Sequence, residues 1–188
     1  RCVYETSYAR IDSGMHDLRV IEVRGAADVG ITTNSLSVVY NSSDVYMENT
    51  DYDLYNLLWQ TRFNLKNESK LDLQLGYNDK KYGANSFYSA KFPNQYDHTS
   101  TYMGTLKGEF GSDLKIIPII YWDRHHDEFQ LKRNTDYPPN FHRNDTYGAY
   151  LTFMYRSILG NTSLGGELRR EDVISTALGT PMVEPHRI

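Results

Sequence analysis

The chain of 188 residues is poor in the features by which most enzyme and redox families are recognised. Its one cysteine, Cys2, cannot form a disulfide within the chain. The sequence contains no nucleophile elbow, no phosphate-binding glycine loop and no CxxC pair. Its serines and histidines fall in no recognisable catalytic order. The sequence therefore predicts a protein that is not an enzyme.

Strong charge and long apolar runs are also missing. The formal net charge is −4 at pH 7 and the basic residues are dispersed, so there is no electrostatic footprint for nucleic acid. The absence of any long apolar run excludes membrane helices, but not a membrane barrel, whose strands alternate in polarity. No signal peptide is visible and the first residue is Arg1, which predicts a mature product or an excised piece.

What the sequence does have is aromatic residues, with 16 tyrosines and 7 phenylalanines, which favour β-structure. The clearest two-residue rhythm surrounds a polar connection at residues 66–69. Its two arms place on one face Tyr55, Leu57, Trp59, Thr61, Phe63, Leu65, Leu71, Leu73, Leu75 and Tyr77. Each arm has roughly the 9–11 residues that a tilted strand needs to cross a hydrocarbon layer. The pattern predicts an antiparallel hairpin, which suits either a lipid-facing wall or the cover of a soluble core.

Weaker alternation on both sides extends this hairpin into a predicted antiparallel up-and-down meander of about eight strands. We expect residues 1–16 to be irregular and the strands to lie between about residues 17 and 171. The segment 172–188 is expected to be a loop-like tail, and the whole chain is one β-barrel segment. Near the start, residues 25–28 are expected to turn the chain between two strands. Pro118 should delete a ladder hydrogen bond, so a bulge or a sheet edge is expected there.

The expected connections alternate in length. Short turns are expected at residues 66–69, 111–113 and 159–161, and long loops at 41–51, 83–100 and 132–144. One edge of the sheet then carries tight turns and the other carries long loops, as in transmembrane barrels. A soluble lipocalin-like barrel or β-sandwich is the alternative that the same asymmetry leaves open.

Five stretches carry a resemblance to a known family. They are YMENTDYDLYNLLWQTRFNL (46–65), GYNDKKYGANSFYSAKFPNQ (76–95), YWDRHHDEFQL (121–131), FHRNDTYG (141–148) and TSLGGELRRE (162–171). As a set, they resemble TonB-dependent outer-membrane receptors of the Bacteroidetes type, particularly those labelled as cobalamin transporters. Such receptors are usually barrels of about 22 strands with an N-terminal plug, so the resemblance implies a truncated segment from the first half of the barrel.

The resemblance also implies a role. It implies uptake of a scarce ligand such as cobalamin at the outer membrane of a Gram-negative cell, with a siderophore or another metal chelate as the alternative ligand. A soluble β-barrel or β-sandwich binding module is the alternative of another class. The implied partners are outer-membrane lipid, the ligand, and the TonB system through a plug that this chain lacks.

Ligand-binding residues are expected at the long-loop edge, where aromatic rings and amides lie close in sequence. The candidates are Asn85, Phe87, Tyr88, Phe92, Asn94, Gln95, Tyr96, Trp122, His125 and His126. The loop rings could instead pack among themselves, and Trp122 could anchor the wall at the membrane interface. Adjacent residues of a strand face opposite ways, so His125 and His126 can share one ligand only across a bulge.

A metal site is the remaining expectation. Asn49, Asp51 and Asp53 alternate where a long loop enters a strand, and their oxygens suit a calcium ion. The simpler alternative is a solvated strand end facing the lumen. Apart from this possible Ca²⁺, the sequence predicts no cofactor.

Overall fold

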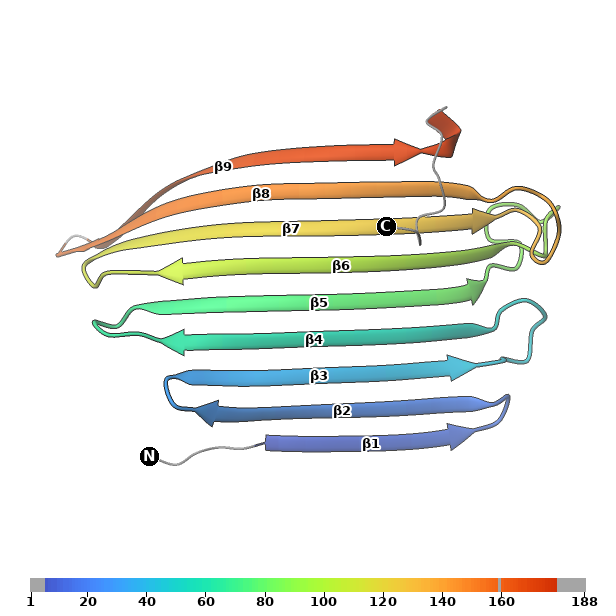
Figure 1. Cartoon of the computed structure of the whole chain (residues 1–188), viewed down its shortest axis with the longest axis horizontal. Helices are drawn as coiled ribbons and strands as arrows, with labels where there is room; N and C mark the ends of the chain where they lie inside the picture. Colours follow the sequence, from blue (N-terminus) through green and yellow to red (C-terminus); the bar gives the residue numbers. More distant parts are fainter. Residues whose placement is uncertain (1–5, 159, 179–188) are drawn as a thin grey trace.

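The computed structural model describes residues 6–158 and 160–178, which form one nine-stranded antiparallel sheet whose strands follow in chain order (Figure 1). The strands are β1 (Thr6–Gly14), β2 (Leu18–Val29), β3 (Thr32–Ser43), β4 (Tyr52–Asn64), β5 (Lys70–Gly83), β6 (Tyr96–Glu109), β7 (Leu114–Gln130), β8 (Asn140–Ser157) and β9 (Gly160–Ser175). A short 3-10 helix, η1 (Thr176–Leu178), follows β9. Within these residues no helix is long and apolar enough to span a membrane. The predicted all-β meander is confirmed.

The start of the chain differs from the expectation. Residues 6–14, expected to be irregular, form β1, so the sheet has nine strands instead of about eight. Their polarity alternates weakly, but their backbone groups are satisfied by pairing with β2. The turn expected at residues 25–28 is also wrong, because β2 runs through them and the chain turns at Gly30, whose φ of 61° favours glycine.

The end of the strand region is longer than expected. Strand β9 continues to Ser175, which pairs with His142, so the tail expected from residue 172 begins later. Residues 179–188 lie outside the described part of the chain. The turn expected at 159–161 is shorter, because Gly160 already pairs with Ser157, and residue 159 is also outside the described residues.

Pro118 interrupts pairing on one side only, and the bulge or sheet edge expected there is wrong, because β7 lies between β6 and β8 and keeps its register with both. The ladder between β6 and β7 is interrupted where Gly108 lies opposite Pro118 and resumes at the Phe110–Ile116 bridge in the same register. On its other side β7 pairs without a gap, including Pro118 with Leu151. Because proline has no backbone N–H, a short part of the hydrogen-bond ladder between β6 and β7 is lost, but no bulge is introduced.

The connections divide between the two edges of the sheet (Figure 1). The long ones lie together at one edge and span residues 44–51, 84–95 and 131–139. The opposite edge has short turns, and at one of them Asn67 and Glu68 take the positive φ angles of a type I′ hairpin turn. The predicted separation of long loops from short turns is confirmed. The β1–β2 connection is the exception, since it is a short turn on the long-loop side.

The strand register gathers the apolar side chains on one face, which we call the apolar face. Its members from successive strands include Ile21, Val23, Leu36, Val38, Leu57, Trp59, Leu75, Ile120, Leu151, Phe153, Leu164 and Leu168. All twelve are exposed, and the only buried apolar side chain among the described residues is Ala84. The sheet therefore has an apolar surface but no dry core of its own.

Aromatic pairs mark one boundary of the apolar face. The ring of Tyr40 lies 4.6 Å from that of Tyr55 on β3 and β4, and the ring of Tyr77 lies 4.9 Å from that of Tyr102 on β5 and β6. The second pair is displaced by two residues towards the short-turn edge, because Tyr77 lies opposite Leu57. From the first pair to the second, the rings shift by two residues along the strands over a distance of two strands. If the belt is level, this shift corresponds to a strand tilt of roughly 35°. Strands of membrane barrels tilt by about this angle, so the pairs form a level belt across tilted strands.

Beyond the belt, towards the long loops, the same face becomes polar and its buried groups are paired. The carboxylate of Asp79 accepts a hydrogen bond from Ser100 (2.7 Å) and lies 2.9 Å from Nε2 of His98. Farther along the sheet, Asp145 is contacted by Arg124 at 2.6 Å and by a second arginine on its own strand. The apolar part of this face therefore ends at the belt, where charged and hydrogen-bonded residues begin.

These faces predict the effect of a charge. Leu73 lies on the apolar face of β5, four residues from Tyr77 of the belt in the direction of the short-turn edge. At a strand tilt of roughly 35°, this places Leu73 about 11 Å from the belt. Leu73→Arg should therefore lower the free energy of unfolding in phospholipid vesicles by about 2–4 kcal/mol. Gln74→Arg, on the opposite face, should stay within about 0.5 kcal/mol of the parent. Urea titration followed by tryptophan fluorescence measures both, and equal losses would reverse the assignment of the faces.

Candidate functional site

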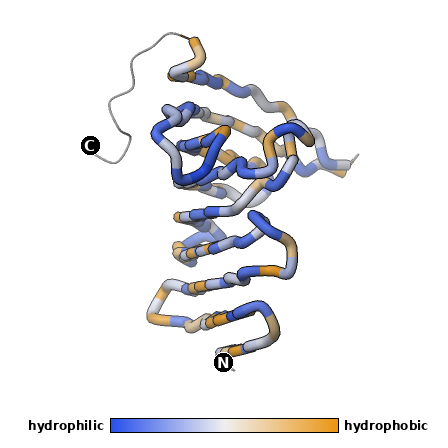
Figure 2. Tube along the Cα trace, turned by 90° about the vertical axis from the view of Figure 1, so that its right-hand side faces the viewer, coloured by the Kyte–Doolittle hydropathy of each residue, from blue (hydrophilic) through white to orange (hydrophobic). Residues whose placement is uncertain are grey.

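The long-loop edge is tied together by Asn49, in the loop between β3 and β4. Its side-chain amide donates to the carbonyl oxygens of Pro93 (2.9 Å) and Gln95 (2.6 Å) in the loop between β5 and β6. The backbone N–H of Asn85 donates to the carbonyl of Asn49 at 3.1 Å. A Cβ at Gly83 would lie 2.5 Å from the Asn49 carbonyl carbon, so the two loops meet only because this position has no side chain. Figure 2 views this edge from the front, with the larger loops gathered over one half of the sheet.

Arg133 joins the third loop to the other two. Its guanidinium contacts both carboxylate oxygens of Asp51, at 2.5 and 2.8 Å, and lies 4.7 Å from the centre of the Tyr96 ring. Its backbone N–H donates to the carbonyl of Asn94 at 2.7 Å. The ion pair lowers the pKa of Asp51, chiefly through the hydrogen bonds from Arg133. One side chain thus fixes three connections relative to each other.

The loop between β5 and β6 is built around Gln95. This side chain is almost completely buried, and its Oε1 accepts the backbone N–H of Tyr88 at 3.2 Å. Its carbonyl oxygen also accepts the backbone N–H of Ala84 at 2.9 Å. Because its buried side-chain amide is hydrogen-bonded within the loop, Gln95 stabilises the loop conformation and is not exposed for contact with a ligand.

Two rings of this loop stand exposed at the edge. Phe87 is 74% and Tyr88 is 62% exposed. The Phe87 and Tyr88 rings make an edge-to-face contact at 4.9 Å, and Tyr88 makes a second one with Phe129 of β7 at 5.1 Å. The pair is therefore held in place from below while its outer surface stays free, which suits stacking on a large ligand.

The other residues predicted to bind a ligand are spread over both faces. Trp122 and His126 lie on the apolar-face side, where Trp122 is level with the aromatic belt and His126 makes an edge-to-face contact with Tyr102. His125 faces the opposite side and shares a 2.8 Å hydrogen bond with Thr101. The adjacent histidines thus do not converge on one ligand, because regular β-geometry separates them.

Within the loop, the remaining candidates have structural contacts. The Asn85 side chain donates to the carbonyl of Glu48 at 2.7 Å. The backbone N–H of Phe92 donates to the carbonyl of Ser89 at 3.0 Å, and Asn94 is exposed. The part of the predicted set that is free to meet a ligand is therefore centred on Phe87 and Tyr88.

The residues predicted to bind calcium are not gathered at one point. Asn49 and Asp51 both face Arg133, which occupies the space between them with a positive charge. Asp53 instead accepts a hydrogen bond from the Tyr40 hydroxyl at 2.9 Å. Calcium binding by these three residues stays a prediction, and it would have to compete with Arg133 for Asp51.

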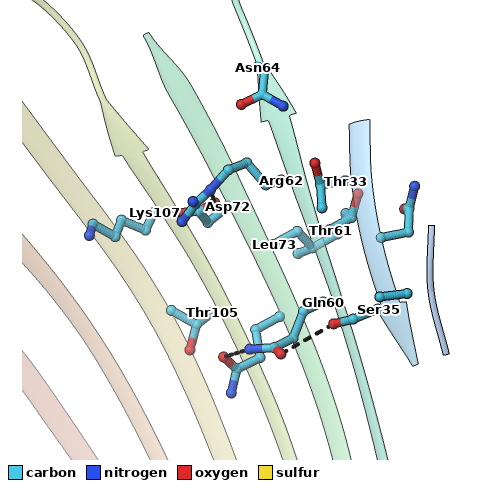
Figure 3. A pocket seen from close by; sticks show the side chains of 13 residues that line it. Thr33, Ser35, Gln60, Thr61, Arg62, Asn64, Asp72, Leu73, Thr105 and Lys107 are labelled. Atoms are coloured by element: carbon cyan, nitrogen blue, oxygen red, sulfur yellow. Dashed lines mark hydrogen bonds and ion pairs between the residues drawn. The ribbon is translucent and has the colours of Figure 1, made fainter. Parts of the chain in front are cut away.

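The polar face has a hollow lined by residues of β2 to β6, several of whose side chains are hydrogen-bonded to each other (Figure 3). Arg62 contacts both oxygens of Asp72, and Gln60 donates to Gln74 at 3.0 Å. These groups border a shallow hollow of about 500 Å³. A surface of this kind suits a water-filled or plugged barrel interior.

Sequence reasoning missed Arg133, Phe129, Asp97 and Asp127. Asp97 is 4% exposed, and its carboxylate accepts a hydrogen bond from Tyr82 at 2.9 Å. Burial, followed by the proximity of Asp127, raises the pKa of Asp97 to about 6. Alternation could have placed these two carboxylates on one face, but their approach to each other depends on the register between β6 and β7.

No protein-family model matches the chain, and no curated protein matches it significantly. Among solved structures, the chain is similar to the siderophore receptor PiuA from Acinetobacter baumannii, with a TM-score of 0.67 and 11% sequence identity. The similarity covers 87% of this chain and 30% of that chain. The chain therefore spans under a third of that receptor's length and shares the fold of the matched part.

The Arg133 junction gives a stability prediction. Arg133→Ala should lower the free energy of unfolding by about 1–2 kcal/mol, less than for a fully buried pair because both side chains keep about a third of their exposure. The lowered pKa of Asp51 means that this contribution is present above its ordinary pKa of 3.8 and is lost as the pH falls below it.

The difference between parent and variant should therefore shrink in acid, in denaturant titrations at a series of pH values. Lys132→Ala removes an exposed charge from the neighbouring position and serves as the control. A difference that is constant through acid pH would show that the ion pair contributes nothing.

Proposed function

We propose that this chain forms part of the wall of a TonB-dependent receptor in the outer membrane of a Gram-negative cell. The proposal rests on one observation, which is that the apolar face of the sheet is exposed. Among the described apolar residues, only Ala84 is buried. In water, an apolar surface of this extent would drive aggregation. Against hydrocarbon it is the stable arrangement, and the aromatic belt gives it a boundary. The likeness to a receptor's fold supports the proposal.

The proposed receptor takes up a large metal chelate. The long-loop edge supports this, because it presents two exposed rings on a loop that other loops hold in place. Cobalamin is one candidate, from the sequence resemblance. A ferric siderophore is the other, since PiuA is described as a siderophore receptor. Both ligands offer broad, partly apolar surfaces on which aromatic rings can stack.

Transport itself would need the TonB system, acting through a plug inside the barrel. The hydrogen-bonded polar face around Arg62 and Asp72 gives such a plug a hydrophilic wall to pack against. Uptake of the ligand should then stop in cells without TonB, while binding at the surface persists.

The ligand site is tested by removing the two exposed rings. Phe87→Ala with Tyr88→Ala, in the full receptor purified in detergent, should weaken binding by more than about tenfold, because each buried ring contributes roughly 1 kcal/mol or more. Isothermal titration with vitamin B12 and with a ferric siderophore measures the loss and shows which ligand class binds.

Tyr46→Ala is a matched control, since Tyr46 is 79% exposed and its ring lies beside His16, away from the Tyr88–Phe129 contact. An unchanged dissociation constant in the folded double variant would leave the rings a structural role only. If neither ligand binds the parent protein, the proposed ligand class is rejected.

The alternative, a soluble β-module, makes the opposite prediction about detergent. A chain that stays folded and monodisperse without detergent, as seen by size-exclusion chromatography with light scattering, would contradict a lipid-facing band. We expect rapid aggregation instead.

A further inference from the structure

Strands β7, β8 and β9, which lie side by side at one end of the sheet, carry two further features on the apolar-face side (Figure 1). One is a cluster of arginines just beyond the aromatic belt, towards the long loops. The other is an apolar groove just across the belt, towards the short turns. A charged group beside an apolar groove matches the two parts of a membrane lipid, its headgroup and its acyl chains.

The arginine cluster surrounds Asp145 of β8, which is buried. Arg124 of β7 donates from Nε to Oδ1 at 2.6 Å and from Nη2 to Oδ2 at 3.3 Å, so it satisfies both carboxylate oxygens. Nε of Arg143 lies 3.1 Å from the same Oδ2, yet it is buried and makes no hydrogen bond within the described residues. One carboxylate therefore faces two guanidinium groups, and the charge of Arg143 is in excess.

Neighbouring carboxylates do not neutralise this excess. Asp172 of β9 lies opposite Asp145, but it is already paired with Arg170 at 3.0 Å. Glu128 of β7 accepts a hydrogen bond from Gln130 at 2.8 Å and forms no ion pair in the part of the chain that the structure describes. Excess positive charge at a membrane surface attracts anionic headgroups.

In the proposed orientation, the cluster lies at the depth of lipid headgroups. Trp122 and Tyr147 are paired across β7 and β8, level with the aromatic belt, and the Arg124–Asp145 pair follows two residues farther towards the long loops. The Arg124 guanidinium also lies 5.6 Å from the centre of the Trp122 ring, a cation–π contact that holds it at the belt. Because aromatic belts lie at the headgroup level, the phosphate groups of lipids can reach this cluster.

The groove lies between β8 and β9 and has a volume of about 520 Å³. A Cβ at Gly166 would meet no atom within 4 Å, so the missing side chain leaves open space between Leu164 and Leu168 on the same strand. The residues that line the groove from the apolar face are Ala149, Leu151, Phe153, Leu164, Gly166 and Leu168. Such walls give an acyl chain more packing contacts than a flat surface does.

We propose that the arginine cluster and the groove together bind one anionic lipid, with its phosphate at Arg143 and an acyl chain over Gly166. The inference rests on the lipid-facing orientation proposed above for the apolar face. A guanidinium can donate two parallel hydrogen bonds to a phosphate, which supplies the partner that Arg143 lacks. Asp145 and Ala149 lie roughly 13 Å apart along β8, so a lipid whose phosphate is at the cluster extends its chains into the groove.

The opposite end of the apolar face lacks this combination. A smaller hollow of about 300 Å³ lies beside Gly25 of β2, where a Cβ would also meet no atom within 4 Å. Arg19 lies beyond the belt on the same strand, but it donates from Nε and Nη2 to Asp17 at 3.1 and 2.8 Å. Since this positive charge has its own carboxylate, we expect no anionic lipid to be held there.

The test is native mass spectrometry of the full receptor, delipidated in detergent and titrated with dioleoyl phosphatidylglycerol. We expect one retained lipid. Arg143→Gln should weaken its binding by about fivefold, the effect of one basic side chain on an anionic headgroup. Asp145 keeps both hydrogen bonds from Arg124 in this variant, so the fold should persist. Gly166→Leu should fill the groove and weaken binding by about threefold or more, because the acyl chain loses packing contacts.

Arg19→Gln and Gly25→Leu are the matched controls, since they make the same kinds of change on the same face at the other end of the sheet. Both should leave binding unchanged. Equally tight binding of dioleoyl phosphatidylcholine, or of inorganic phosphate alone, would overturn the proposal, as would unchanged binding in both Arg143→Gln and Gly166→Leu. A receptor that needs detergent but retains no phosphatidylglycerol would refute the lipid site and leave the proposed membrane orientation intact.

Discussion

The structure depends on the two-residue alternation of its strands, which places apolar side chains on one face of the sheet. A single curved sheet cannot bury both of its faces, and in this chain only Ala84 among the described apolar residues is buried. In the receptor wall that we propose, the free energy that a globular domain gains from its core comes instead from contact between the apolar face and hydrocarbon. Every other feature, from strand tilt to the position of the charged rim, is compatible with that one requirement.

The aromatic belt links local sequence to orientation. Tyrosines are paired across β3 and β4 and again across β5 and β6, and the second pair is shifted by two residues. A flat sheet with upright strands would need no shift. The shift keeps amphipathic rings at one depth while the strands tilt, as closure of a barrel demands.

Loops at the long-loop edge are joined to one another by polar contacts, while the Phe87–Tyr88 pair rests on Phe129. Asn49 and Arg133 satisfy backbone carbonyls and a carboxylate from neighbouring loops, so removal of either leaves partners without bonds. This leaves Phe87 and Tyr88 exposed without loosening the loop that carries them.

The sequence by itself determined the all-β meander, the faces of the β4–β5 hairpin and the division between short turns and long loops. These follow from local alternation and turn chemistry, which need no knowledge of distant residues. It failed for β1, whose weak alternation is overridden by pairing with β2, and for the turn that Gly30 makes. Only the tertiary structure decided which loop side chains are free, that Arg133 pairs with Asp51, and that Asp97 lies near Asp127. Those contacts join residues of different strands and loops, and their geometry is set by strand register and sheet curvature, which no local pattern encodes.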